Sequence, residues 1–249
     1  MPKQIVAVTI PIYKSTLDKD ELASLLQCIK ILSGHPIIFF GPESLDIGVY
    51  KNACAGKIEF NIEYFDEDYF KDIDGYNKIM LSPFFYERFK GFKFIFIYQL
   101  DAWVFKDDLL CWCSKSYDYI GAPWHQNMWS ASVAKHATIP RKILTKLGYR
   151  RFNLVGNGGL SLRKVNSCIF NLKLFKKQAD KFKMNEDYFF SFFINSYNPL
   201  FKIPTASLAF KFAFEVEPEK AYLLNDKQLP MGCHAWPKFK YFWKDFILE

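Results

Sequence analysis

Asp101 is the first candidate for a chemical role, because it directly follows the apolar, strand-like run at residues 92–100. In open α/β sheets, ligands bind at the carboxyl ends of the strands. A carboxylate there could help to hold Mg²⁺ or Mn²⁺, which take oxygen ligands and usually share them with substrate phosphates. Asp is equally common as a cap in a βα turn. Asp101 alone therefore leaves both interpretations open.

A glycine-dense turn at residues 156–159 is the second candidate. Glycine adopts positive φ and lets a ligand approach the backbone closely, and the Asn157 amide could bind sugar hydroxyls. The spacing matches neither the phosphate loop nor the dinucleotide fingerprint. A bare glycine turn is about as often structural as ligand-binding.

Two adjacent carboxylates, Glu186 and Asp187, open an apolar segment with helical character at residues 185–197. Neighbours on a helix point about 100° apart, so one of them at most is expected to face a given site. Both could equally serve as favourable charges at a helix N-terminus. His234 is one of four histidines, and a lone histidine is more often structural than a ligand.

The elements that must position these residues follow a strand, helix, strand order. Residues 18–32 have apolar side chains at helical spacing, and residues 76–89 predict a helix interrupted near Pro83. Short apolar runs predict strands at residues 4–13, 35–44, 57–65 and 92–100. This order predicts a mostly parallel sheet with crossover helices. Asn185 is a candidate N-cap for the helix at residues 185–197.

Composition narrows the class of protein. The chain has 249 residues, of which 50% are hydrophobic, so we expect a single domain over residues 1–249. A net charge of +7 suits a nucleotide, a lipid headgroup or a nucleic acid. The lysines are scattered and no nucleic-acid motif is present, so we do not expect nucleic acid as a partner. The six cysteines lack metal-finger spacing and indicate reduced thiols in the cytoplasm.

The lengths of the apolar segments indicate whether the chain could cross a membrane. The N-terminal apolar stretch is shorter than a secretory core, and no run reaches the roughly 20 apolar residues of a span. A cytoplasmic protein is expected. Basic and aromatic side chains at residues 236–246 would allow peripheral contact with the inner face of the membrane.

The order of these features is a stronger signal than any one of them. A strand and helix at the N-terminus, a strand-end Asp, a Gly-Gly turn, an acidic pair opening a helix and a late His together resemble the layout of nucleotide-sugar glycosyltransferases with the GT-A fold. More narrowly, the chain is similar to a family of bacterial glycosyltransferases of capsule and lipopolysaccharide clusters, long filed as a domain of unknown function. The resemblance spans residues 5–238 and rests on IPIYK, SPFFYERF, IYQLDAWVF, YDYIGAPW, GNGGLSLR, NEDYFF and GCHAW.

The resemblance implies a fold and an activity. The fold would be α/β, GT-A-like (Rossmann-like), with a mostly parallel central sheet flanked by helices. Residues 1–105 would form the nucleotide-binding half and residues 106–249 the acceptor and catalytic half. The protein would move a sugar from a nucleoside-diphosphate sugar, UDP-linked by preference, to a hydroxyl of a glycan or lipid-linked glycan at the cell surface.

The resemblance also implies roles for individual residues. The Asp-x-Asp motif that binds Mn²⁺ or Mg²⁺ in GT-A enzymes reads here Gln99-Leu100-Asp101, so the first acid is missing and metal dependence stays open. Asp101 and His234 would hold the cation. Asp187 would be the general base of an inverting reaction, and Glu186 would orient the acceptor.

Further residues complete the implied site. Pro11 and Tyr13 would hold the nucleobase, Lys78 would stabilise the diphosphate, and Trp124 would stack on the acceptor sugar. Gln99, Asn157 and the Gly158-Gly159 turn would also contact the donor. The missing acid at Gln99 equally suits a catalytically inactive protein that binds nucleotide sugars or carbohydrate.

Overall fold

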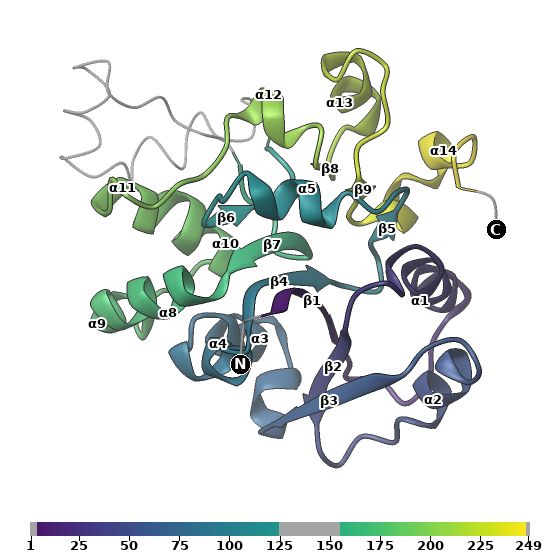
Figure 1. Ribbon diagram of the computed structural model, residues 1–249, viewed down its shortest axis with the longest axis horizontal. Helices are drawn as coiled ribbons and strands as arrows, with labels where there is room; N and C mark the ends of the chain where they lie inside the picture. Colours follow the sequence, from purple (N-terminus) through teal and green to yellow (C-terminus); the bar gives the residue numbers. More distant parts are fainter. Residues whose placement is uncertain (1–3, 125–154, 248–249) are drawn as a thin grey trace.

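A six-stranded sheet forms the centre of the molecule (Figure 1). The computed structural model describes residues 4–124 and 155–247. The strand order is β3-β2-β1-β4-β7-β6, with β3, β2, β1 and β4 parallel and β7 antiparallel to both of its neighbours. The predicted mostly parallel α/β sheet is confirmed. The strands are β1 (Gln4–Pro11), β2 (Ile37–Pro42), β3 (Phe60–Phe65), β4 (Phe92–Tyr98), β6 (Tyr119–Ile120) and β7 (Leu160–Lys164).

Alternate side chains of the central strands supply two separate cores. In β4, Phe94 and Phe96 point to one face of the sheet, whereas Ile95 and Ile97 point to the other, as the period of two in a strand requires. All four are fully buried. A strand buried on both faces reads as a continuous apolar run, which is why β4 was predictable from sequence.

Helices cover both faces of this sheet. One face packs against α1 (Lys19–Leu32), α2 (Gly48–Cys54) and α5 (Leu109–Ser114). The other packs against α3 (Ile73–Met80), α4 (Pro83–Arg88), α8 (Val165–Leu174) and the π-helical turn η3 (Phe189–Ile194). Helix α1 begins with a capping box between Asp18 and Glu21, which satisfies two backbone N–H groups that have no partner within the helix. Pro83 opens α4, so the predicted interruption is confirmed.

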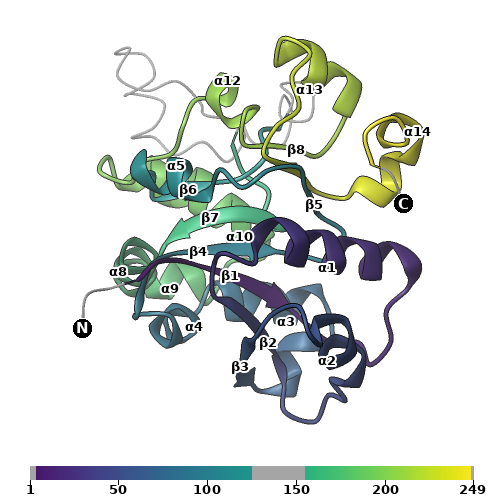
Figure 2. The ribbon, with the colours of Figure 1, turned by 45° about the vertical axis from the view of Figure 1, so that its right-hand side comes forward.

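A smaller sheet is formed mainly by the carboxyl-terminal part of the chain. It has the order β5-β9-β8, with β5 (Trp103–Val104), β8 (Ala213–Phe214) and β9 (Gly232–Cys233). Figures 1 and 2 both place α12 (Ala206–Ala209), α13 (Pro218–Leu224) and β8 on the side of the large sheet away from β3. The Trp236 indole donates to Ser24 Oγ at 2.8 Å, which ties this part to α1. Trp236 lies in η4 (Trp236–Phe239), which leads into α14 (Lys240–Trp243).

The acidic pair opens a helix that differs from the predicted one. The segment divides into α10 (Glu186–Tyr188), the π-helical η3 and α11 (Asn195–Tyr197). Asn185 occupies the N-cap position, but its side chain makes no capping hydrogen bond. The Asn77 side chain in α3 accepts from the Glu186 N–H instead, at 3.0 Å. The helix start is therefore held by a distant element, which local sequence cannot show.

Within residues 4–124 and 155–247, no helix is long and apolar enough to cross a membrane. All six cysteines are free thiols, and five of them are buried. Cys233 is fully buried, and burial raises the pKa of its thiol well above the usual range. This supports its interpretation as a packed residue.

Candidate functional site

A cavity of about 580 Å³ lies at the carboxyl end of β4 and collects most of the predicted site residues. Its lining comes from the segments after β1 and β4, the turn before β7, η1 (Glu67–Phe70), α3, α10, η4 and the loops after β8 and β9, so no single stretch of sequence forms it. The predicted residues in its wall are Tyr13, Gln99, Asp101, Trp124, Asn157, Gly158, Gly159, Glu186, Asp187 and His234.

Antiparallel pairing of β4 with β7 brings the first two motifs together. Tyr98 at the end of β4 lies opposite Leu160 at the start of β7. The Gln99 N–H donates to the Gly159 carbonyl at 2.8 Å, so the pairing continues past the strand ends. The Gln99-Leu100-Asp101 segment and the glycine turn therefore form adjacent parts of one wall.

His234 lies between two carboxylates at the centre of this wall. Its Nε2 is 3.0 Å from Asp101 Oδ1 and 3.1 Å from Gln99 Oε1, and its Nδ1 is 3.1 Å from Glu215 Oε1. Pairing of Cys233 with both Trp103 and Phe214 sets this position, because it fixes β9 beside the segments that follow Asp101 and precede Glu215. The predicted partnership of Asp101 with His234 is thus a direct contact in the structure.

The two carboxylates change the proton affinity of the ring. Burial lowers the pKa of His234, but the ion pairs with Asp101 and Glu215 outweigh it and raise the pKa to about 10. For Asp101, burial raises the pKa and the charge of His234 lowers it, with a net decrease. Without a cation in the site, His234 is an imidazolium at neutral pH and donates from both nitrogens.

The donor set around His234 also fits a divalent cation. Adjacent ligand atoms of an octahedral Mg²⁺, each about 2.1 Å from the ion, lie about 3.0 Å apart, which matches the distances from His234 Nε2 to Asp101 Oδ1 and to Gln99 Oε1. Glu215 at Nδ1 is the outer carboxylate that commonly orients a metal-binding histidine. Such a cation would displace the Nε2 proton.

Side chains alone do not complete such a site. Across the described parts of the chain, no group of three or more His, Cys, Asp or Glu side chains is arranged to hold a metal. The amide oxygen of Gln99 is neutral and contributes no charge. Oxygen atoms of a bound substrate would have to fill the remaining positions, as is usual for Mg²⁺ with phosphates.

Asn157 holds the glycine turn in shape. It has a positive φ of 36°, and its Oδ1 accepts from the N–H groups of Gly159 and Leu160 at 3.1 and 3.2 Å. Its amide nitrogen donates to Glu215 at 2.5 Å. Asn157 therefore links the turn to the Glu215–His234 pair. This role depends on contacts between residues far apart in the chain, so the local sequence does not show it.

The glycines of the turn allow close approach of charged side chains. A Cβ at Gly158 would lie 2.2 Å from Glu186 Oε1, and a Cβ at Gly159 would lie 2.1 Å from His234 Nε2. Real Cβ atoms do not approach other atoms so closely, so a Cβ at either position would displace these side chains. Because its glycines have no side chains, the turn leaves space for Glu186 and His234 as well as for a ligand.

Glu186 is held by a buried arginine. Arg163 donates to Glu186 Oε1 at 2.7 Å, and both side chains are almost fully buried. Arg163 also donates to Tyr86 and Ser161, each at 2.9 Å. The second oxygen of Glu186, Oε2, is buried in the cavity wall and has no hydrogen-bond partner among the described residues. A ligand hydroxyl could donate to this oxygen.

Asp187 has the electrostatic environment of a proton acceptor. Burial raises its pKa well above the usual range, and the nearby charges of Glu186 and Glu215 add to this effect. The Tyr188 N–H donates to Asp187 Oδ1 at 2.7 Å. General bases work best when their pKa is near the working pH, and the ordinary pKa of Asp is too low for that.

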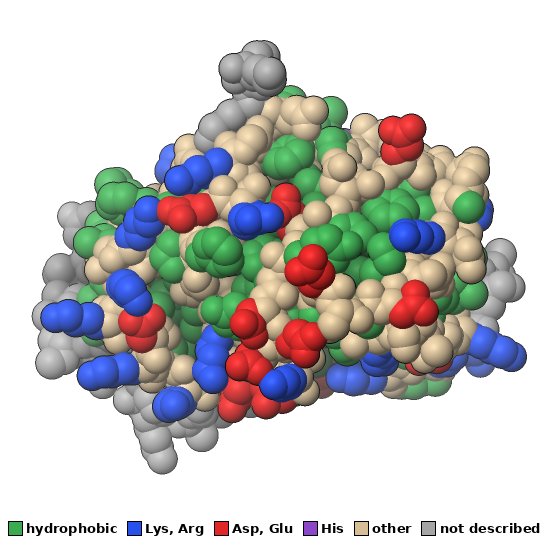
Figure 3. Space-filling view, turned by 90° about the horizontal axis from the view of Figure 1, so that it is seen from below, with side chains coloured by type: hydrophobic (Ala, Val, Ile, Leu, Met, Phe, Trp, Pro, Cys, Tyr) green, Lys and Arg blue, Asp and Glu red, His purple; other side chains and the backbone are tan. Residues whose placement is uncertain are grey.

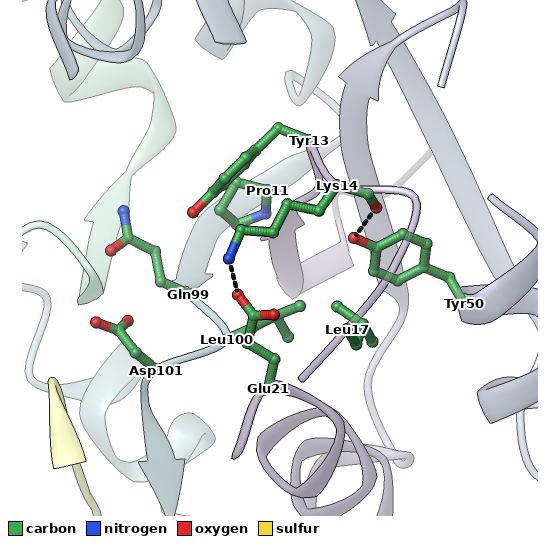
Figure 4. A pocket seen from close by; sticks show the side chains of 9 residues that line it. All are labelled: Pro11, Tyr13, Lys14, Leu17, Glu21, Tyr50, Gln99, Leu100 and Asp101. Carbon is green, nitrogen blue, oxygen red and sulfur yellow. Dashed lines mark hydrogen bonds and ion pairs between the residues drawn. The ribbon is translucent and has the colours of Figure 1, made fainter. Parts of the chain in front are cut away.

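A second cavity of about 250 Å³ adjoins the first at the end of β1 (Figure 4). Pro11 and Tyr13 line it, as do Gln99 and Asp101 on the opposite side. Lys14 extends across it and forms an ion pair with Glu21 Oε1 at 2.5 Å. Pro11 therefore lies in this smaller cavity, whereas Tyr13 lines both.

Trp124 forms part of the wall near Asp187. Its ring stacks on Tyr188 at 4.8 Å between centroids with an interplanar angle of 14°. Its outer edge lies where a Cβ of Gly156 would be. The indole is largely buried by these contacts, so a sugar would meet the combined edge of the Trp124–Tyr188 stack.

Lys78 is not in the predicted place. It is exposed on α3 and lines a different cavity, formed with α4, α8 and α9 (Lys176–Ala179). Its position in α3 explains this, because Ile73, Tyr76 and Asn77 are the residues of that helix that line the main cavity. The lysines in the wall of the main cavity are Lys71 and Lys238. Lys78 therefore does not line the cavity that collects most of the other predicted site residues.

Four site residues were missed by sequence reasoning. Glu215 and Arg163 act through His234 and Glu186, and Lys14 and Glu21 form the ion pair of the smaller cavity. Glu215 stands in a charged stretch with no motif, and Arg163 follows the glycine turn at the end of a strand. No local signal marks either, because their roles depend on contacts between residues far apart in the chain.

Comparison with protein families assigns the chain. Residues 59–234 match the family model described as a protein of unknown function, DUF5672. The chain belongs to this family. The match covers the segments that supply Asp101, the glycine turn, the acidic pair and His234, while β1, α1 and β2 precede it. No curated protein matches the sequence.

Solved structures show which fold this DUF5672 protein has. Mouse xyloside xylosyltransferase 1 in its apo form matches with a TM-score of 0.53 and 12% identity, over 93% of this chain and 97% of that one. An active-site mutant of LgtC matches with a TM-score of 0.50 and 15% identity, over 92% and 86%. Identities this low show the fold alone. The predicted GT-A-like fold of glycosyltransferases is confirmed.

Replacing Gly159 with alanine should separate His234 from its carboxylate partners. The new Cβ would lie 2.1 Å from His234 Nε2 and 2.6 Å from Gln99 Oε1, so both side chains must move. Loss of the Asp101 ion pair should then lower the pKa of His234 from about 10 by about one unit or more. A pH titration of the histidine ring signals by NMR measures this, with His234→Gln providing the assignment.

The matched control is Gly91→Ala, where an added Cβ meets nothing within 4 Å. Its His234 titration should equal that of the wild type. An unchanged pKa in Gly159→Ala would contradict the arrangement of the turn around His234.

Removing the guanidinium of Arg163 should destabilise the fold. In Arg163→Met, the Glu186 carboxylate would remain buried without its cation, which typically lowers the free energy of unfolding by about 3–5 kcal/mol. The double variant Arg163→Met/Glu186→Gln removes the unpaired charge and should recover part of this loss. Denaturant unfolding of the three proteins measures both effects. Equal stability of the single and double variants would show that the charge pair is not the cause.

Proposed function

We propose that this protein transfers a sugar from a nucleoside-diphosphate sugar to a hydroxyl of an acceptor glycan. The observation that carries the proposal is the convergence of Asp101, the Gly158-Gly159 turn, Asp187 and His234 on one cavity at the carboxyl end of β4. In sheets of this kind, ligands bind at that edge. The GT-A-like fold supports a glycosyl-transfer reaction rather than another use of the same cavity.

Asp187 is the proposed general base. The acceptor oxygen attacks the anomeric carbon while the bond from that carbon to the phosphate oxygen breaks. The acceptor proton passes to Asp187, and the diphosphate leaves with the bonding electron pair. The raised pKa of Asp187 supports this role, because it brings the group closer to the working pH. An attack of this kind inverts the anomeric configuration.

Glu186 and Arg163 are proposed to position the acceptor. The unpartnered Oε2 of Glu186 would accept a hydrogen bond from an acceptor hydroxyl beside Asp187. Arg163 holds Glu186 in place through this contact. Burial lowers the pKa of the Arg163 guanidinium, but the charge of Glu186 outweighs it and holds that pKa well above its usual range. In this proposal Asp187 accepts the proton and Glu186 orients the acceptor, so both carboxylates are needed.

The donor would extend from the smaller cavity to the glycine turn. Pro11 and Tyr13 would contact the nucleobase, with a UDP donor favoured, and the Gly158-Gly159 turn would contact the transferred sugar. Lys238, which lines the main cavity and lowers the pKa of Asp101, would face the diphosphate. Lys238 would thus supply the positive charge that was expected from Lys78.

Asp101 and His234 are the proposed protein ligands of a divalent cation, with Gln99 as a neutral third donor. Such a cation, when bound, supplies positive charge that stabilises the leaving diphosphate. Glu215 would orient His234 for this contact from the opposite side of the ring. The resemblance to enzymes of capsule and lipopolysaccharide clusters supports a cell-surface glycan as the acceptor.

Titration with nucleotides tests the proposal directly. We expect calorimetry to detect micromolar binding of UDP in the presence of Mn²⁺ and weaker binding in EDTA, with GDP as the comparison. Binding that persists in EDTA would keep the nucleotide site and remove the cation from it. No binding of either nucleotide would contradict the proposed function.

Substitution of the proposed base separates binding from catalysis. Asp187→Asn should lower the rate of transfer by about 10²- to 10⁴-fold, the usual contribution of a general base, while the dissociation constant of UDP stays within about twofold. Sugar transfer from a panel of UDP-sugars and UDP titration of the same preparations give the two values. Asp245→Asn, on the exposed C-terminal segment, is the control. Loss of UDP binding in Asp187→Asn would show that the role is misassigned.

The amide at Gln99 favours a second candidate, a protein that binds nucleotide sugars or carbohydrate without turnover. Its position would hold the first acid of the Asp-x-Asp motif in GT-A enzymes. This alternative predicts binding of UDP-sugars with no transfer or hydrolysis under any divalent cation. Measurable turnover with any donor excludes it.

A further inference from the structure

A separate cavity of about 450 Å³ adjoins the main one. Its wall comes from α3, α4, α8, α9 (Lys176–Ala179) and the segment at residues 180–184. The two cavities share Tyr69 and Asn77. Asn77 also accepts from the Glu186 N–H, so the boundary between the cavities lies at the start of the acidic pair.

The lining of this cavity combines an apolar floor with basic side chains. The apolar residues are Leu81, Pro83, Leu172, Ala179, Phe182 and Met184. The charged residues are three lysines, Lys78, Lys176 and Lys183, and two aspartates, Asp74 and Asp180, so the lining has one more basic than acidic side chain. The C–H face of a sugar ring packs on apolar surface, and a carboxylate on the same ring would meet the lysines. The lining therefore fits an acidic sugar better than a neutral one.

Two of these lysines have charge available for a ligand. Lys176 forms an ion pair with Asp180 at 2.7 Å. Lys78 lies within electrostatic range of the exposed Asp68 but forms no ion pair with it, and no ion pair joins Lys183 to a carboxylate of the described residues. The surrounding segment at residues 173–183 holds five lysines and one aspartate. Figure 3 shows basic side chains predominating on its left, the end of the molecule that carries α8 and α9 in Figure 1.

We propose that this cavity is a subsite for a negatively charged sugar residue, such as a uronic acid, of the acceptor glycan. The proposal rests on the function proposed above. Lys183 and Asp187 are four residues apart, which limits their Cα separation to roughly 14 Å. An oligosaccharide whose reacting hydroxyl lies at Asp187 can therefore extend past Asn77 to Lys78 and Lys183.

An anionic membrane surface is the alternative partner for the same lysines, but the geometry favours the glycan. Lys78 and Lys183 line a recess between α3 and the segment after α9, and this recess continues into the cavity of the acidic pair. A sugar chain enters such a recess, whereas a bilayer surface contacts protruding side chains. An acidic acceptor would also be attracted by the surrounding lysines before it binds.

The test compares two trisaccharides of equal length, trigalacturonic acid and maltotriose. Calorimetric titration at low ionic strength, in EDTA so that the acid binds no metal, should show at least tenfold tighter binding of trigalacturonic acid to the wild type. Lys78→Gln/Lys183→Gln should abolish this preference. The control Lys51→Gln/Lys244→Gln removes two charges from exposed lysines of α2 and the C-terminal segment and should keep it.

Equal binding of the two trisaccharides to the wild type would overturn the proposal, as would equal loss of preference in both double variants. Sedimentation with phosphatidylserine vesicles separates the membrane alternative: vesicle binding that only Lys78→Gln/Lys183→Gln loses, without trisaccharide binding, would also overturn it. UDP titration of the same preparations tests the nucleotide site independently. A retained acidic preference without UDP binding would support the subsite and contradict the proposed transferase.

Discussion

The antiparallel pairing of β7 with β4 is the constraint on which the site depends. It places the glycine turn beside the segment that follows β4, so that Gln99 and Asp101 share a wall with Asn157 and Gly159. Every other functional side chain is positioned relative to this wall. A parallel neighbour would have brought the opposite end of β7 to the same edge, and the glycine turn would have been about five residues away.

Buried charges complete the site in two linked groups. Arg163 neutralises Glu186 beneath the glycine turn, and Glu215 and Asp101 hold His234 above it. Each group contains a charge that would be unfavourable alone in the protein interior. Because Asp187 lies near both Glu186 and Glu215, its raised pKa is a property of the assembled site. The geometry that holds the ligands in place therefore also tunes the proposed base.

The cavities form a continuous path across the edge of the sheet. The smaller one at Tyr13 adjoins the main one, and the main one shares Asn77 with the lysine-lined recess. Asn77 holds the start of α10 as well, so the element that carries the acidic pair is attached to the wall between two cavities. A donor at one end and an acceptor at the other would meet at Asp187.

The sequence by itself determined the sheet and the candidates for chemistry. Continuous apolar runs such as β4 predict buried strands, and the motifs around Asp101, Asn157, Asp187 and His234 were identified from residue types and order. Only the tertiary structure decided which residues meet. It places Glu215 beside His234 and Lys78 outside the main cavity. These positions depend on strand pairing and on which face of α3 is turned toward the cavity, and not on local sequence pattern.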